Sequence, residues 1–424
     1  MKPPSIAIIG GGPSGLLFAR LLELSSIRDY VVFERDESAK PGVWQQGGTL
    51  DLHGPSGQLA LKRAGLFEDF STKLARWNAT CFHVLDPTAK TVVNFKEERD
   101  APEIDRLQLR QLLLSSIPQN KIRWGHAVST VERKAKDGQV GKDNGCTIHF
   151  TNGTSASGFH LIVGADGSWS KVRHLIIPAK PVYSGKMFIE GIISHGNPIY
   201  MKANEIAGPG SMLAIGNQKQ ISLQQVSNGT YRLYFGLKVP EDFYGFSHNQ
   251  NASQAQEKST LHADIASRSE TLRQLLLSSD DFYARWAPLL RALIENAEGP
   301  FRPWPLYRMD PEAVGWNRDV APGVTLLGDA AHVSTPFVGE GVNCSMLDAV
   351  MLADSIIKYY DNGATPTNDE TTWLEHALAS YEKEMFVRGR DLIQRSTESE
   401  ERLFAENAPD LFLEWFNSAL QDKS

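Results

Sequence analysis

The first 34 residues constrain the fold more than any other stretch of the chain. Residues 5–9 and 30–33 are compact apolar runs, as expected of buried strands. Between them, a G-x-G-x-x-G motif opens a segment with the apolar spacing of a helix: Gly10, Gly12, Pro13, Ser14 and Gly15. Such glycines let the backbone approach a pyrophosphate at a helix N-terminus, and Glu34 would accept hydrogen bonds from ribose hydroxyls. This unit predicts a dinucleotide site on a parallel sheet.

A second motif lies far along the chain, where an apolar run at 324–327 is followed by Gly328-Asp329-Ala-Ala-His and a loop. The loop, 336–343, precedes a helical pattern at 344–357. A helix N-terminus favours an anion, whereas the Asp329 carboxylate suits a ribityl hydroxyl. The alternative is an ordinary strand-to-helix turn built from small residues.

Other segments add candidate cofactor contacts. One apolar strand ends in Gly-Ala-Asp-Gly, which places Asp166 at the carboxyl edge of a parallel sheet, where cofactors bind in such folds. Two glycines, the second of them Gly48, precede Asp51, which is either a ribityl partner or a turn aspartate. Arg106 begins an amphipathic segment and is a candidate cofactor contact, whereas we favour a surface role for Arg110, one turn later.

Composition excludes several other classes of protein. The chain has 424 residues, 41% of them hydrophobic, which is enough for two domains or more. A net charge of −7 without a basic run argues against nucleic acid as a partner. The three cysteines are scattered, so we expect neither a disulfide framework nor a metal site. We expect a reduced, cytoplasmic compartment. We expect no signal peptide, since the chain enters an apolar strand by Ser5, and no membrane span, since no run of eighteen apolar residues occurs; we also expect a monomer.

The middle of the chain has a different pattern. Strand-like alternation predicts an antiparallel sheet with one face free for a ligand, together with a hairpin at 81–85 and 91–95. The predicted fold class is α/β: a Rossmann-like nucleotide-binding domain with an inserted antiparallel-sheet domain and a C-terminal helix. The expected boundaries are 1–77, 104–178 and 300–360 for the first domain, 78–103 and 179–299 for the second, and 361–424 for the C-terminal helical segment.

Taken in order, the motifs at 10–15, 164–173 and 328–343 resemble those of the flavin-dependent aromatic hydroxylases of the para-hydroxybenzoate hydroxylase type (class A). Gly47-Gly-Thr-Leu-Asp-Leu-His53 and Ala330-Ala-His332 are most similar to the tetracycline-inactivating monooxygenases of that family. The resemblance implies FAD as cofactor and NADPH or NADH and O₂ as co-substrates. It further implies hydroxylation of an electron-rich aromatic, phenolic or polycyclic, tetracycline-like molecule through a flavin C4a-hydroperoxide.

The resemblance also implies which residues contact FAD, and it assigns no side-chain acid or base. We interpret His332 as a loop histidine that shapes its turn. The implied FAD contacts come from all three motifs and the segments between them: Gly10, Gly12, Pro13, Ser14, Gly15, Glu34, Arg35, Gly48, Asp51, Arg106, Asp166, Gly328, Asp329, Pro336, Gly339, Gly341, Val342 and Asn343.

A substrate wall is implied on the inserted sheet and the loop after Asp329: Phe188, Glu190, Ser211, Leu213, Tyr234, Pro336, Phe337 and Gly339. The sequence departs there from the tetracycline enzymes. Glu190 replaces a glutamine, Ser211 and Tyr234 replace an arginine and a histidine, and Glu340 stands where a glutamine is usual. We therefore expect weak tetracycline binding and a different polycyclic or phenolic substrate.

Strand alternation limits this wall, because Phe188 and Glu190 share one face while Met187 and Ile189 share the other. If Glu190 faces the ligand, its buried carboxylate needs a partner and would prefer a hydroxyl, an amide or a cation. The alternative is a solvent-facing Glu190 with Met187 and Ile189 in the core.

Three other functions are compatible with parts of the pattern. The same fold can perform Baeyer–Villiger oxygenation or epoxidation, or bind FAD without catalysis. A flavin halogenase is disfavoured, because its W-x-W-x-I-P motif does not occur here.

Overall fold

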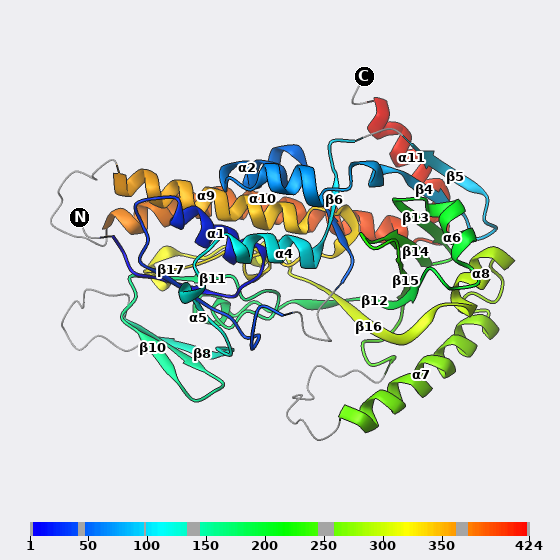
Figure 1. The fold of residues 1–424 in the computed structure, drawn as a ribbon, viewed down its shortest axis with the longest axis horizontal. Coiled ribbons are helices and arrows are strands. Elements are labelled where there is room, and N and C mark those ends of the chain that lie inside the picture. Colours follow the sequence, from blue (N-terminus) through cyan, green and yellow to red (C-terminus); the bar gives the residue numbers. More distant parts are fainter. Residues whose placement is uncertain are drawn as a thin grey trace. The chain divides into compact units, whose positions relative to one another are not determined.

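The computed structural model describes residues 3–40, 47–96, 99–133, 145–244, 258–361 and 372–421, with side chains left out at 258–266. The chain forms two compact units (Figure 1). Unit 1 comprises Met1–Ala75, Arg106–Val182 and Tyr307–Thr397, and unit 2 comprises Arg76–Asp105, Tyr183–Leu306 and Glu398–Ser424. Each unit is therefore built from three separate stretches of the sequence.

Unit 1 is organised around a five-stranded parallel sheet, as predicted. In the order β17-β11-β1-β2-β7, its strands are Val324–Leu326, Leu161–Gly164, Ile6–Ile9, Tyr30–Phe33 and Ile122–Arg123. The central strands β1 and β11 are buried along their whole length, which explains why they are apolar throughout rather than alternating. The main helices of this unit are α1 (Pro13–Glu23), α4 (Arg106–Ser115), α9 (Gly341–Asp361) and most of α10 (Thr372–Leu403).

Smaller elements complete unit 1. An antiparallel sheet consists of β8 (Val128–Arg133), β9 (Cys146–Phe150) and β10 (Ser155–Ser157). The remaining short elements are β3 (Thr49–Asp51), α2 (Leu59–Arg63), α3 (Phe67–Asp69) and α5 (Arg173–Ile176).

Unit 2 contains a seven-stranded sheet in the order β16-β12-β15-β14-β13-β4-β5. Its strands, in that order, are Glu298–Arg308, Val182–Ile193, Tyr231–Lys238, Lys219–Gln225, Ser211–Gly216, Phe82–Leu85 and Thr91–Phe95. The predicted hairpin is present as β4 and β5, but the sheet is not wholly antiparallel, because β13 pairs with β4 in parallel. No strand was predicted at β16, which contains three prolines and lies at the edge of the sheet, where prolines are tolerated.

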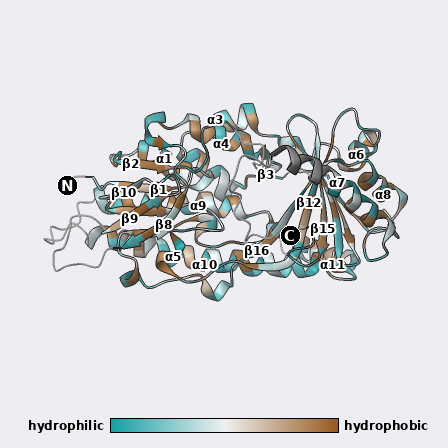
Figure 2. Ribbon diagram, turned by 90° about the horizontal axis from the view of Figure 1, so that it is seen from below, coloured by the Kyte–Doolittle hydropathy of each residue, from teal (hydrophilic) through white to brown (hydrophobic). Residues whose placement is uncertain are grey.

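One face of this sheet packs against α7 (Lys258–Ser278) and α8 (Pro288–Glu295). Met187 and Ile189 of β12 and Phe235 of β15 belong to the same buried apolar cluster as Leu276 of α7 and Leu293 of α8. Figure 2 shows the hydrophobic residues along β12 and β15. The opposite face therefore carries the other set of side chains, those of Phe188 and Glu190.

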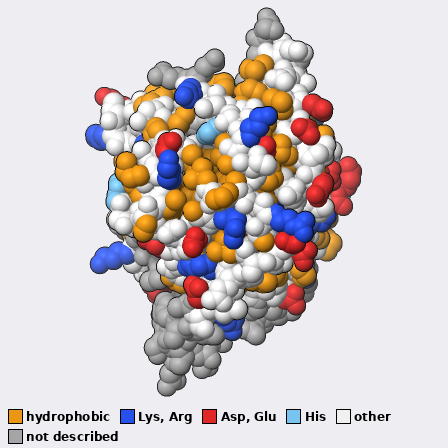
Figure 3. All heavy atoms as spheres, turned by 90° about the vertical axis from the view of Figure 1, so that its right-hand side faces the viewer, with side chains coloured by type: hydrophobic (Ala, Val, Ile, Leu, Met, Phe, Trp, Pro, Cys, Tyr) orange, Lys and Arg blue, Asp and Glu red, His pale blue; other side chains and the backbone are white. Residues whose placement is uncertain are grey.

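Unit 2 also contains β6 (Glu103–Asp105), α6 (Tyr200–Ala207) and α11 (Ala408–Gln421). Figure 3 shows one face of the molecule, on which hydrophobic side chains gather near the middle with charged side chains around them. None of the helices within the described ranges combines the length and the hydropathy needed to cross a bilayer.

Candidate functional site

The G-x-G-x-x-G turn lies between β1 and α1, at the carboxyl edge of the parallel sheet. Gly10 has φ 113°, and a Cβ there would lie 2.2 Å from the Ala165 carbonyl oxygen, so only glycine fits. Gly12 is the N-cap of α1; it makes no side-chain capping bond, and a Cβ added to it would meet no atom within 4 Å. The N-terminus of α1 therefore has no capping side chain and has room beside Gly12, which suits a pyrophosphate.

Glu34 follows β2 and is 6% exposed. Its carboxylate accepts hydrogen bonds from the Gly11 N–H at 2.5 Å and the Asp36 N–H at 3.0 Å. Arg110 donates to the Gly11 carbonyl at 3.2 Å and pairs with Asp36 at 2.9 Å. Since Arg110 is only 8% exposed, our expectation of a surface role for it is wrong. Arg35, beside Glu34, is exposed.

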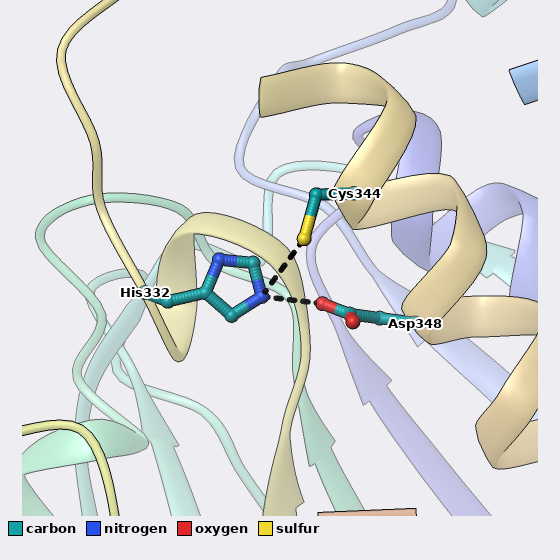
Figure 4. A group of neighbouring side chains, drawn as sticks. All are labelled: His332, Cys344 and Asp348. Carbon is teal, nitrogen blue, oxygen red and sulfur yellow. Dashed lines mark hydrogen bonds and ion pairs between the residues drawn. The ribbon is translucent and has the colours of Figure 1, made fainter. Parts of the chain in front are cut away.

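The turn after β17 is held by a buried carboxylate on α9 (Figure 4). Asp348 accepts hydrogen bonds from the Gly328 N–H at 2.9 Å and from His332 Nε2 at 2.6 Å, which lie at the two ends of the turn. Arg388 of α10 donates to the other carboxylate oxygen at 2.6 Å. Asp329, between these ends, is exposed, and its carboxylate accepts a hydrogen bond from the Ser168 hydroxyl at 3.2 Å.

The ionisation of this cluster follows from its contacts. Burial alone would lower the pKa of His332, but the Asp348 carboxylate raises it well above its usual value. Burial alone would raise the pKa of Asp348, but His332 and Arg388 hold it below its usual value. Cys344 Sγ lies 3.9 Å from His332 Nε2, and a His, Cys and Asp group of this kind could ligate a metal. Asp348 is already bound by His332 and Arg388, so we assign the cluster to holding the turn.

Asn343, in the first turn of α9, joins two segments that are distant in sequence. Its side-chain oxygen accepts hydrogen bonds from the His53 and Gly57 N–H groups at 2.9 and 3.2 Å, and its amide donates to the Asp51 carbonyl at 2.8 Å. A Cβ on Gly339 would lie 3.5 Å from an Asp51 carboxylate oxygen. The structure thus brings the segment around Asp51 next to the loop that precedes α9.

The Asp51 carboxylate is also paired with His53 Nε2 at 3.0 Å, and both side chains are partly exposed. Gly48 accepts a hydrogen bond from the Arg106 N–H at 3.1 Å, which places the start of α4 beside the same segment. Val342 and Gly341 lie in the first turn of α9, and a Cβ on Gly341 would meet no atom within 4 Å. Glu340, in the loop before that turn, is paired with Arg395 of α10 at 2.7 Å.

The middle motif has a structural role in this arrangement. Asp166 accepts hydrogen bonds from the Lys171 and Val172 N–H groups at 2.7 and 3.3 Å, and burial raises the pKa of its carboxyl. Arg173 is fully buried and donates to the Ser168, Asp329 and Ala330 carbonyls. Arg173 therefore ties this motif to the turn that carries Asp329. No role was predicted for Arg173, because the carbonyls of Asp329 and Ala330 lie 156 and 157 residues away in the sequence.

In unit 2, the five predicted substrate residues of the sheet fall on one face. Four cross-strand partners form a row across β12, β15, β14 and β13, which in that order are Glu190, Tyr234, Ser222 and Leu213. By the same alternation Phe188 and Ser211 point to this side, away from the apolar cluster with α7 and α8. Pro336, Phe337 and Gly339 belong to unit 1, in the short turn Pro336–Val338 and just after it.

Glu190 is 3% exposed, and both of its carboxylate oxygens are engaged. Arg232 donates to one oxygen at 2.7 Å and the Trp304 indole N–H to the other at 2.8 Å. The buried carboxylate therefore has the partners that its burial requires. A solvent-facing Glu190, the alternative left open by the sequence, is not what the structure shows.

Comparison with known proteins gives a consistent result. Residues 314–396 match a family model described as "FAD binding domain", which includes the Gly328–Asn343 motif. The chain is 32% identical over 438 residues to monooxygenase asqM of Emericella nidulans, covering 96% of this chain and 97% of that protein. It is 27% identical to an FAD-dependent urate hydroxylase of Klebsiella pneumoniae, covering 92% and 88%. The structure of tetracycline destructase Tet(51) shares the fold, with a TM-score of 0.66, 16% identity and coverage of 99% and 96%.

Proposed function

This chain belongs to the family of FAD-dependent monooxygenases, as a flavin hydroxylase of class A, and we propose that it uses NAD(P)H and O₂ to hydroxylate an electron-rich aromatic, phenolic or polycyclic small molecule. The observation that carries the proposal is the convergence of the glycine turn, Glu34 and the Asp329 turn on one edge of a parallel sheet. That edge is where cofactors bind in such folds.

FAD is the cofactor, and the residues of unit 1 fit it. We assign the pyrophosphate to the uncapped N-terminus of α1 at Gly12, where the space is open. Glu34 is assigned to the ribose and Asp329 to the ribityl chain. Gly341–Asn343, at the N-terminus of α9, offer N–H groups to the pyrimidine end of the flavin, and Asp51 lies next to this loop.

When bound, FAD supplies the redox chemistry that activates O₂. The protein's share is to bind, orient and exclude water, and no side chain in the described site has to act as acid or base. Asn343, by fixing the Asp51 segment to α9, keeps the two walls of the flavin site together. The Asp348 cluster does the same for the turn that carries Asp329.

For the substrate, we propose the polar and aromatic face of the unit 2 sheet that carries Phe188, Glu190 and Tyr234. Relatives named as urate hydroxylases support a planar aromatic ring. The departures at Glu190, Ser211 and Tyr234 support a preference for molecules other than tetracyclines.

The test is flavin reduction followed by product analysis. FAD-loaded protein under argon should bleach on addition of NADPH or NADH, and phenols, polyketides and urate should be screened for stimulated NAD(P)H oxidation. Mass and position of the added oxygen separate hydroxylation from epoxidation and Baeyer–Villiger insertion. Stoichiometric FAD that neither nicotinamide bleaches would instead indicate a non-catalytic flavin protein, and efficient tetracycline turnover would contradict the proposed substrate preference.

A further inference from the structure

The loop between the Asp329 turn and α9 is held at both ends by neighbouring residues of α10. At its start, the Thr335 hydroxyl lies 3.0 Å from the Ser396 hydroxyl, which also donates to the Thr335 carbonyl. At its end, Glu340 binds Arg395 through both carboxylate oxygens, at 3.0 Å from Nη1 and 2.7 Å from Nη2. Such a parallel pair of charge-assisted hydrogen bonds fixes the carboxylate and the guanidinium in one geometry.

Glu340 is the N-cap residue of α9. Its carbonyl oxygen accepts the first hydrogen bond of the helix, from the Cys344 N–H at 2.9 Å. An acidic N-cap side chain usually accepts from the N–H groups of the first turn, but the hydrogen bonds to this carboxylate come from Arg395. Within the described part of the chain, no side chain therefore caps the N–H groups of residues 341–343, which suits a ligand with negative charge.

The ion pair also determines the charge at this helix end. A helix N-terminus carries about half a positive charge, and an unpaired carboxylate beside it would cancel that charge. Arg395 supplies the compensating cation, and its hydrogen bonds to Glu340 raise the pKa of Arg395 above its ordinary value, so the compensation holds at every working pH. The carboxylate of Asp51, which also approaches the loop, is instead paired with His53, whose charge depends on pH.

This charge matters because we assign the pyrimidine end of the flavin to the N-terminus of α9. A flavin that takes up two electrons and one proton gains one negative charge, which lies at the pyrimidine end of its ring system. An electropositive N-terminus therefore binds reduced FAD more tightly than oxidised FAD. The ratio of these two affinities shifts the reduction potential of the bound flavin, and an uncompensated Glu340 would shift it in the opposite direction.

We propose that Arg395 compensates the negative charge of Glu340 and thereby keeps the N-terminus of α9 favourable to reduced FAD. The inference rests on the proposed function for the position of the flavin, and it makes Arg395 a positioning residue that acts through Glu340. The alternative is a purely structural salt bridge. Because the side chains of Arg395 and Glu340 are 41% and 33% exposed, the pair would then contribute little to stability and nothing to the potential.

The experiment measures the reduction potential of bound FAD by stepwise addition of dithionite under argon, at pH 8 and with a reference dye. Arg395→Gln leaves the Glu340 carboxylate unpaired, so reduced FAD should bind about threefold to tenfold more weakly relative to oxidised FAD. A tenfold change corresponds to a fall of about 30 mV for a two-electron couple. The fall should be smaller in 0.5 M NaCl, because salt screens partly exposed charges.

The substitution of the partner and the double variant separate charge from structure. Glu340→Gln removes the carboxylate and leaves the cation, so the potential should rise, by less than it falls in Arg395→Gln because Asp391 still pairs with Arg395 at 2.7 Å. The double variant has no charge at either position and should return to about the wild-type potential. Loosening of the loop would instead shift both single variants and the double variant in the same direction.

Asp391→Asn is the matched control. Asp391 also binds Arg395, through Nε, but it lies on α10 itself and its side chain is 59% exposed. Removal of its charge should therefore leave the potential at the wild-type value. Titration with oxidised FAD and thermal unfolding establish that each variant is loaded and folded.

An unchanged potential in folded, FAD-loaded Arg395→Gln would overturn the inference. So would a lowered potential in Glu340→Gln, a double variant as low as Arg395→Gln, or an equally large shift in Asp391→Asn. Dithionite replaces NAD(P)H in this assay. Bound FAD that dithionite reduces and NAD(P)H does not would therefore count against the proposed function and leave the role of Arg395 standing.

Discussion

Replacing Asp348 by asparagine should damage unit 1 more than its small chemical change suggests. The carboxylate is completely buried and accepts hydrogen bonds from Gly328, His332 and Arg388. Asparagine fills the same volume but offers one acceptor oxygen, and its amide N–H groups face a donor. At neutral pH the partners include the Arg388 cation and the His332 ring, whose pKa is raised well above its usual value by Asp348.

Removing one member of a buried ion pair costs about 3–5 kcal/mol, because the partner's charge stays buried without compensation. We expect a loss of that size in the free energy of unfolding of the apo-protein, measured by urea unfolding with circular dichroism. Since Asp348 holds both ends of the turn that carries Asp329, FAD affinity measured by flavin titration should fall as well.

The same substitution at Asp354 is the matched control. Asp354 also lies on α9 and also pairs with an arginine, Arg63, but both side chains are more than 40% exposed. Exposed pairs contribute about 0–1 kcal/mol, so Asp354→Asn should change little. Equal losses in the two variants, or a loss below about 1 kcal/mol for Asp348→Asn, would refute the role of burial.

The pH dependence of that loss has a definite sign. The pKa of Asp348 is lower in the folded protein than in the unfolded chain. Its contribution to the free energy of unfolding is therefore complete above the pKa of the unfolded state and is lost as pH falls through the pKa of the folded state. The pKa of His332 is higher in the folded protein than in the unfolded chain. Its contribution to the free energy of unfolding is therefore complete below the pKa of the unfolded state and is lost as pH rises through the pKa of the folded state. The difference between wild type and Asp348→Asn should therefore be largest between about pH 4 and 6.5.

Three further changes test other parts of the protein. Burial raises the pKa of Glu382 from 4.5 to about 7, although Arg318 beside it acts in the opposite direction. The folded wild type therefore binds this proton more tightly than the unfolded chain, and the contribution of Glu382 to the free energy of unfolding should fall as pH rises from 4.5 to 7. Glu382→Gln should remove this contribution to the pH dependence, measured by urea unfolding at pH 5 and 8. Gly12→Ala and its control Gly196→Ala should leave the apo-protein equally stable, because the added Cβ meets no atom within 4 Å at either position. Only Gly12→Ala should weaken FAD binding in a flavin titration. Equal FAD affinity of the two variants would refute the assigned pyrophosphate position. Asp329→Ala should weaken FAD about tenfold to a hundredfold by loss of one charge-assisted hydrogen bond, and an unchanged dissociation constant would contradict its ribityl role.

The fold of unit 1 was predictable because its signals are local. A strand, a glycine turn and a helix follow one another within residues 5–23, and Gly10 and Glu34 come directly after β1 and β2. The buried arginines were not predictable. Arg110 and Arg173 bind backbone carbonyls 99 and 156 residues away, and sequence spacing carries no information about such contacts.

The sheet of unit 2 shows where alternation succeeds and where it fails. The period of two correctly separated Phe188 and Glu190 from Met187 and Ile189. It missed β16, because Pro300, Pro303 and Pro305 interrupt the apolar pattern; an edge strand tolerates them since one of its sides needs no ladder hydrogen bonds.

Glu190 shows why a substrate class is harder to predict than a cofactor. Considered alone, a buried carboxylate favours a ligand that donates a hydrogen bond or carries a positive charge. Arg232 and Trp304, 42 and 114 residues away in sequence, each donate to one of its oxygens, so the protein itself supplies partners that the burial of this carboxylate requires. The surroundings of Glu190 are thus decided by a long-range pairing, whereas the proposed FAD site is built on backbone turns that the local sequence encodes.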